Sequence, residues 1–64
     1  MTQYQVVFKN YQGNFRTSLT VEANNVNDAR KLATEKKKQV FYKYFIDKYV
    51  ICNVIDLETN KEYY

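Results

Sequence analysis

A single glycine, Gly13, lies between two stretches of the 64-residue chain in which apolar and β-branched residues recur at every second position. A period of two places such residues on one face of a β-strand. Glycine supplies the positive φ angle of a tight turn at no steric cost. The pattern therefore predicts a β-hairpin that turns near Gly13 and has one apolar face. The positions predicted to share that face are Tyr4, Val6, Phe8, Phe15, Thr17, Leu19 and Val21.

Helix signals follow the hairpin. Asn25 can cap a helix with its side-chain oxygen, and Asp28 lies three residues later, in the expected first turn. The lysines at 36–38 suit the other end, because the helix dipole favours cations there and anions near the start. We predict a helix over residues 26–38. Its apolar residues at helical spacing are Ala29, Leu32 and Ala33.

The segment 39–46, with the sequence QVFYKYFI, fits neither period cleanly. As a continued helix it keeps Val40 and Tyr44 on the apolar helix face, whereas as a strand it places Val40, Tyr42, Tyr44 and Ile46 on one side. Its aromatic and β-branched residues favour the strand, and the absence of a helix breaker after the lysines favours the helix. We interpret the segment as a helix that continues into the forties, with a strand as the alternative.

Residues 49–57 are apolar on both sides for most of their length, which is typical of a central strand. Residues 58–61 then form a polar turn, and residues 62–64 can pair back as a short final strand. The predicted fold class is α+β: one small domain over residues 1–64, ββαβ or ββαββ in order, with the helix packed on one face of a mainly antiparallel sheet. A regular alternation in the 49–57 strand places on one face Tyr49, Ile51, Asn53, Ile55 and Leu57.

The chain contains no histidine, one cysteine and one glycine, and this composition excludes several kinds of chemistry. Without imidazole it lacks the side chain whose ordinary pKa suits proton transfer near neutral pH, and triads built on histidine are impossible. One cysteine without histidine offers no plausible zinc ligand set, and one glycine cannot form a glycine-rich phosphate loop. We therefore predict a protein that is not an enzyme and has neither a cofactor nor a metal.

The lone cysteine, Cys52, lies in the apolar run 49–55, which predicts a buried thiol in a reducing compartment. Residues 1–10 do not resemble a signal peptide, and no stretch has the roughly 20 apolar residues that span a bilayer. We expect a cytoplasmic protein without a membrane partner. Lysine outnumbers arginine eight to two, a bias typical of AT-rich genomes, so a phage or mobile element is the expected source.

Charge is uneven along the chain. Residues 28–48 carry seven cationic and three acidic side chains, a net charge of +4, whereas residues 49–64 have a net charge of −2. Such a basic cluster can meet nucleic-acid phosphates or an acidic protein surface, although lysines also commonly solvate an exposed helix face. No known nucleic-acid-binding motif accompanies the cluster. The residues predicted for nucleic-acid binding, as the alternative function, are Arg30, Lys31, Lys36, Lys37, Lys38 and Lys43.

Eleven aromatic residues, seven of them tyrosines, exceed what so small a core can enclose. Some tyrosines can pack at sheet edges, but exposed tyrosines beside lysines also suit a protein interface. We therefore predict a small accessory or regulatory protein that binds and modulates another protein. A homodimer formed through exposed strand edges or tyrosines is a further possibility. The predicted contact residues for the protein partner are Tyr11, Lys37, Lys38, Tyr42, Lys43 and Tyr44.

Overall fold

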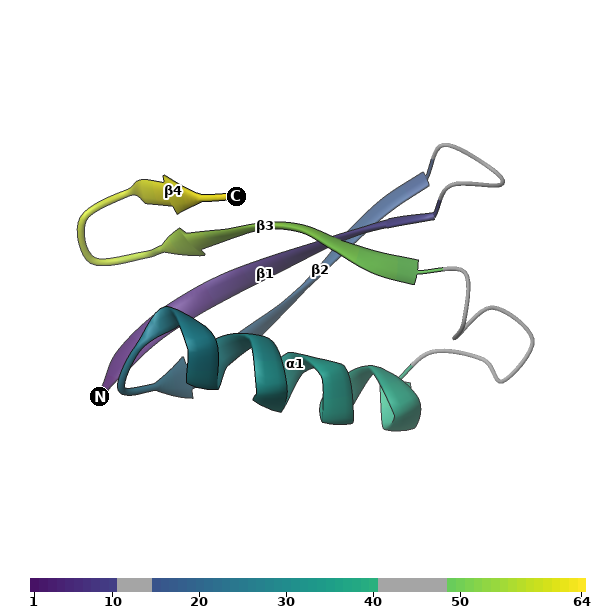
Figure 1. The fold of residues 1–64 in the computed structure, drawn as a ribbon, viewed down its shortest axis with the longest axis horizontal. Helices are drawn as coiled ribbons and strands as arrows, with labels where there is room; N and C mark the ends of the chain where they lie inside the picture. The colour runs from purple at the N-terminus through teal and green to yellow at the C-terminus, as the bar shows by residue number, and fades with distance from the viewer. Residues whose placement is uncertain (11–14, 41–48) are drawn as a thin grey trace.

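Four strands and one helix make up the described parts of the computed structural model, and the strands form one antiparallel sheet in the order β2-β1-β3-β4. Helix α1 lies across one face of this sheet (Figure 1). The predicted α+β fold, with the order ββαββ and the helix on one face, is thereby confirmed. The structure describes residues 1–10, 15–40 and 49–64. The elements are β1 (Thr2–Asn10), β2 (Phe15–Ala23), α1 (Val26–Val40), β3 (Tyr49–Asp56) and β4 (Lys61–Tyr63).

β1 and β2 form the predicted antiparallel hairpin, with Thr2 opposite Ala23 at one end and Asn10 opposite Phe15 at the other. The alternation in β1 places Tyr4, Val6 and Phe8 on the face that α1 covers, where all three are buried. In β2, Val21 is buried and Leu19 packs against the same core. The turn expected at Gly13 falls in residues 11–14, which lie outside the described residues.

The helix connects two strands that run in the same direction. β1 pairs antiparallel with both β2 and β3, so β2 and β3 are parallel to each other on either side of β1. α1 forms the crossover connection between them on one face of the sheet (Figure 1). This arrangement makes β1 a central strand and leaves β2 at an outer edge of the sheet.

α1 begins at the predicted cap. The side-chain oxygen of Asn25 accepts a hydrogen bond from Asp28 N at 2.8 Å, which satisfies one of the free N–H groups of the first turn. Ala29 and Ala33 are fully buried, so their small side chains let the helix lie close to the sheet. The described helix reaches Val40, two residues beyond the predicted 26–38, and the rest of the ambiguous segment lies outside the described residues. No helix in the described ranges is long and apolar enough to cross a membrane.

A β-bulge at Cys52 changes which residues of β3 reach the core. Asn53 lies opposite Val7, but Ile51 lies opposite the next residue, Phe8, so Cys52 is the extra residue. Beyond the bulge the alternation is reversed, and Val54 is fully buried while Ile55 is only half-buried. The predicted single face from Tyr49 to Leu57 was therefore wrong in its second half. The predicted burial of the Cys52 thiol was also too strong, because the residue is half-buried.

The turn between β3 and β4 is organised by Asp56. Its side-chain oxygen accepts hydrogen bonds from Glu58 N at 2.9 Å and Thr59 N at 3.3 Å, and its carbonyl accepts one from Asn60 N at 2.7 Å. Asn60 has a φ of 61°, which is in the left-handed region. Asparagine is among the few residues that tolerate this conformation. The turn returns the chain into β4, where Tyr63 lies opposite Val54 and packs against the core.

Candidate functional site

Every second residue of β2 points its backbone groups away from β1. The direction follows from Gln3, whose carbonyl oxygen accepts a hydrogen bond from Leu57 N at 3.0 Å and therefore faces β3. Alternate residues of a strand direct their N–H and C=O groups to the same side, so every second residue of β1 from Gln3 onward faces β3. The β2 residues opposite them must point their backbone groups outward. These outward residues of β2 are Arg16, Ser18, Thr20 and Glu22.

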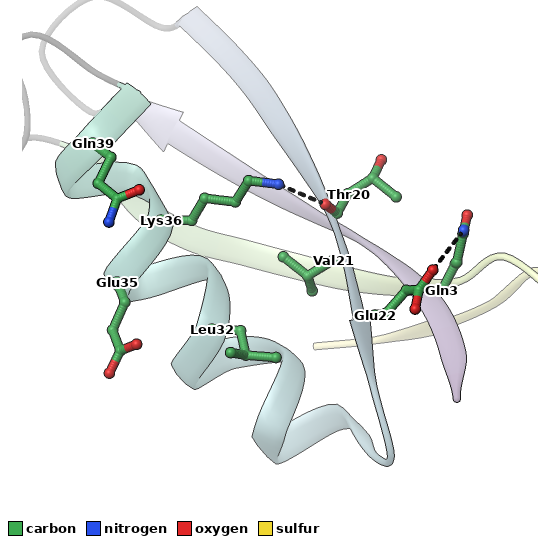
Figure 2. A pocket seen from close by; sticks show the side chains of 8 residues that line it. All are labelled: Gln3, Thr20, Val21, Glu22, Leu32, Glu35, Lys36 and Gln39. Atoms are coloured by element: carbon green, nitrogen blue, oxygen red, sulfur yellow. Dashed lines mark hydrogen bonds between the residues drawn. The ribbon is translucent and has the colours of Figure 1, made fainter.

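A lysine from the helix provides independent support for this direction. The ammonium of Lys36 donates a hydrogen bond to the carbonyl oxygen of Thr20 at 3.3 Å. Its side chain reaches from α1 to the edge of β2, as Figure 2 shows. The Thr20 carbonyl is thus directed outward, where an additional strand would make its hydrogen bonds.

A groove of about 550 Å³ runs between the edge of β2 and α1. Val21 and Leu32 point toward one another from its two sides and give it an apolar base (Figure 2). Leu32 is 43% exposed, which is high for a leucine beside a core. On the helix side the groove also has a carboxylate, an ammonium and an amide, contributed by Glu35, Lys36 and Gln39. We call this feature the β2–α1 groove.

The groove and the strand edge together suit an extended polypeptide. The outward residues of β2 offer backbone donors and acceptors at the spacing of a β-ladder, and an added strand would lie beside Leu32. Among the described residues, no cluster of three or more cysteine, aspartate or glutamate side chains could hold a metal ion. The strand edge offers hydrogen bonding, and the groove beside it offers apolar contact along a strand.

The structure directs two of the predicted basic residues, Lys36 and Lys37, to different strands. Lys36 and Lys37 leave α1 on different sides, since Lys36 contacts the Thr20 carbonyl while Lys37 donates to the Tyr49 carbonyl at 3.0 Å. The Lys37 ammonium also lies 5.9 Å from the centre of the Phe8 ring. Of the other residues predicted for nucleic-acid binding, Arg30 is half-buried, and Lys31 and Lys38 are exposed. Lys43 lies outside the described residues.

Most of the predicted protein-contact residues lie where the structure gives no description. These are Tyr11, Tyr42, Lys43 and Tyr44. The remaining two differ in exposure, because Lys38 is exposed whereas Lys37 is half-buried and bonded to β3.

The described tyrosines are mostly packed against the core. Tyr4 is 5% exposed, and its burial, with the nearby Asp56 carboxylate, raises the pKa of the phenol above 10.0. Tyr49 and Tyr63 are half-buried against the same core. Tyr64 is 83% exposed and donates its hydroxyl to Glu62 at 3.2 Å, a bond that raises its pKa. Of the four described tyrosines, Tyr64 is thus the one with an exposed ring.

The edge of β2 and the β2–α1 groove were not found from the sequence. The alternation predicts β2 but cannot tell which strand pairs on its other side, because strand order depends on where the helix returns the chain. Comparison of the chain with protein-family models, with curated proteins and with solved structures found no match.

Proposed function

We propose that this chain is a small, non-enzymatic accessory or regulatory protein that binds another protein through the edge of β2 that no other described strand covers. An extended segment of the partner adds to the sheet next to β2 and places alternate side chains toward the β2–α1 groove. The observation that carries the proposal is the outward direction of the β2 backbone beside that groove. Bound in this way, the partner segment is held in one conformation, which is how the protein modulates it.

Main-chain pairing supplies most of the binding free energy in this proposal. β2 has nine residues, and a strand of that length presents a ladder about 30 Å long. Each backbone hydrogen bond contributes roughly 0.5–1.5 kcal/mol net, because both partners give up bonds to water. Covering the exposed part of Leu32 adds an apolar contribution. Glu35 and Lys36, which have opposite charges, then discriminate between partner side chains that approach the helix.

The tyrosine and lysine surface around Tyr42, Lys43 and Tyr44 remains a prediction for the same partner. Nucleic-acid binding remains the alternative prediction, and the separate directions of Lys36 and Lys37 do not favour it. We also infer a cytoplasmic location, supported by the lone Cys52, and a phage or mobile-element source, supported by the lysine bias. Fractionation of cells that express the tagged protein tests the location.

A selection from a displayed library of random peptides tests the proposed function. We expect enriched peptides with the alternating pattern of a strand, and amide shifts on binding that are largest at the outward residues of β2. Thr20→Pro removes an outward N–H group and leaves the β1 ladder intact, since proline is tolerated at such edge positions. This variant should fold but lose peptide binding, whereas Thr20→Val, which keeps the N–H group, should bind normally. Binding that Thr20→Pro leaves unchanged would contradict the proposal.

A further inference from the structure

The edge of β2 is complementary to itself. We propose that two copies of the chain pair antiparallel through β2, which forms a two-fold dimer with one continuous sheet and covers the edge reversibly. The inference concerns regulation of the site proposed above and rests on that proposal, because a second copy and a partner segment would compete for the same backbone groups.

The register follows from the strand itself. Complete overlap of two antiparallel β2 strands, Phe15–Ala23, makes Leu19 the centre of symmetry. Arg16 of one copy then lies opposite Glu22 of the other, and Ser18 lies opposite Thr20. All four are outward residues of β2, so the opposed residues can exchange backbone hydrogen bonds. The register with the longest overlap is thus also one that the backbone directions allow.

Charge complementarity selects the same register. Arg16 and Glu22 are both exposed, and the two-fold axis creates their cross-strand pair twice. A shift by two residues in either direction removes both pairs and places Glu22 or Arg16 opposite an uncharged side chain. A larger shift eventually opposes identical charges. Among the registers that place outward residues of the two β2 strands opposite one another, the fully overlapped one therefore joins opposite charges.

A second cation near Arg16 also favours the approach of a carboxylate from another copy of the chain. Within the hairpin it lies directly opposite Lys9, so two cations face each other across β1 and β2. Like charges directly opposite each other in a sheet are destabilising. A Glu22 carboxylate from a second copy would reach Arg16 from the side of β2 opposite to β1 and offset this repulsion. The charge pattern of the hairpin thus favours an anion at the edge.

Lys36 limits the strength of this pairing. Its ammonium lies 3.3 Å from the carbonyl oxygen of Thr20, one residue from the symmetry centre at Leu19, so a dimer brings two Lys36 side chains near each other. The carbonyl has two lone pairs, so Lys36 can keep its bond while a second strand pairs. Lysines at strand edges commonly oppose edge-to-edge association. The result is a weak dimer from which a partner segment can displace one copy.

Sedimentation equilibrium over about a hundredfold range of protein concentration tests the dimer. We expect a reversible monomer–dimer equilibrium for the wild type. Arg16→Glu and Glu22→Arg should each weaken dimerisation about tenfold, because each replaces two attractive pairs with two repulsive ones. The double variant R16E/E22R restores opposite charges and should restore the dimer. Lys36→Gln should strengthen dimerisation, and Lys31→Glu, a charge reversal on an exposed part of α1, should leave it unchanged.

The outcomes separate this inference from the proposed function. A wild type that stays monomeric throughout overturns the self-pairing, as does a dimer that the double variant fails to restore although each single variant weakens it. A dimer unaffected by either single variant also overturns it. In each case peptide binding that depends on the Thr20 N–H group still supports the proposed function. Conversely, a charge-dependent dimer without peptide binding supports self-pairing and contradicts the proposed function. Circular dichroism of each variant verifies that the fold is intact.

Discussion

The ammonium of Lys37 lies 3.0 Å from the carbonyl oxygen of Tyr49, so a side chain near the end of α1 is bonded to the first residue of β3. The same ammonium lies 5.9 Å from the centre of the buried Phe8 ring. Lys37 thus connects the helix to two strands of the sheet, whereas sequence reasoning placed it in a binding surface. Its neighbour Lys38 is exposed.

We expect Lys37→Met to lower the free energy of unfolding by about 1 kcal/mol, because it removes a hydrogen bond from a charged donor in a partly buried position. Lys38→Met has the same change in composition and charge, but it should alter stability by less than about 0.5 kcal/mol. Urea unfolding of both variants followed by circular dichroism measures the difference. Equal effects of the two substitutions would show that the Lys37 contact contributes nothing to stability.

The bulge at Cys52 leads to a second prediction. Deletion of Cys52 would leave Ile51 and Asn53 consecutive and opposite Phe8 and Val7, the partners they already have. The β1–β3 ladder would then be regular, and Ile51 and Val54 would both still face the core. We therefore expect the deletion variant to fold, with a free energy of unfolding within about 1 kcal/mol of the wild type.

Deletion of Ile55 is the matched control for the Cys52 deletion. It removes a residue from the regular part of β3 and moves every later side chain to the opposite face. We expect this variant to be several kcal/mol less stable or unfolded. Thermal unfolding of the two deletion variants compares them directly, and similar losses would indicate that Cys52 is an integral member of the ladder.

Local patterns in the sequence predicted a strand or helix correctly where one pattern, such as alternation or a helix cap, is clear. The alternation of Tyr4, Val6 and Phe8 identified the buried face of β1, and Asn25 with Asp28 identified the start of α1. These signals arise from backbone periodicity and capping, which act within a few residues of the chain.

Features that depend on distant partners could not be predicted in the same way. The side chains of β3 switch faces of the sheet at Cys52 because of how β3 pairs with β1. No residue pattern in an unbroken apolar run predicts such a bulge. Lys36 and Lys37 are adjacent in the sequence, yet the helix directs their ammonium groups to β2 and β3 respectively. A cluster of lysines in the sequence therefore does not establish a basic surface in the fold.

The left-handed conformation of Asn60 leads to a third prediction. Replacement by alanine keeps φ near 61° only at a steric cost, because the Cβ atom approaches the backbone and the amide side chain that eases this is lost. We expect Asn60→Ala to lower the free energy of unfolding by about 1 kcal/mol. Asn60→Gly should remain close to the wild type, since glycine adopts this conformation freely. Denaturant unfolding separates the two variants, and a stable Asn60→Ala protein would argue against a left-handed residue at this position.

Tyr4 should make stability depend on pH in the alkaline range. Burial, and then the Asp56 carboxylate, raise its pKa in the folded state above the ordinary 10.0, so folding favours the neutral phenol. The contribution is fully present below pH 10.0 and is lost as the pH rises through the raised pKa, because the unfolded chain releases the proton first. Tyr4→Phe removes the ionisable group, so its free energy of unfolding should fall less than that of the wild type between about pH 9 and about pH 11. Val6→Ala, which removes no ionisable group, should keep a constant difference from the wild type across this range. A Tyr4→Phe variant whose loss of stability parallels the wild type would show that this phenol does not ionise differently in the two states.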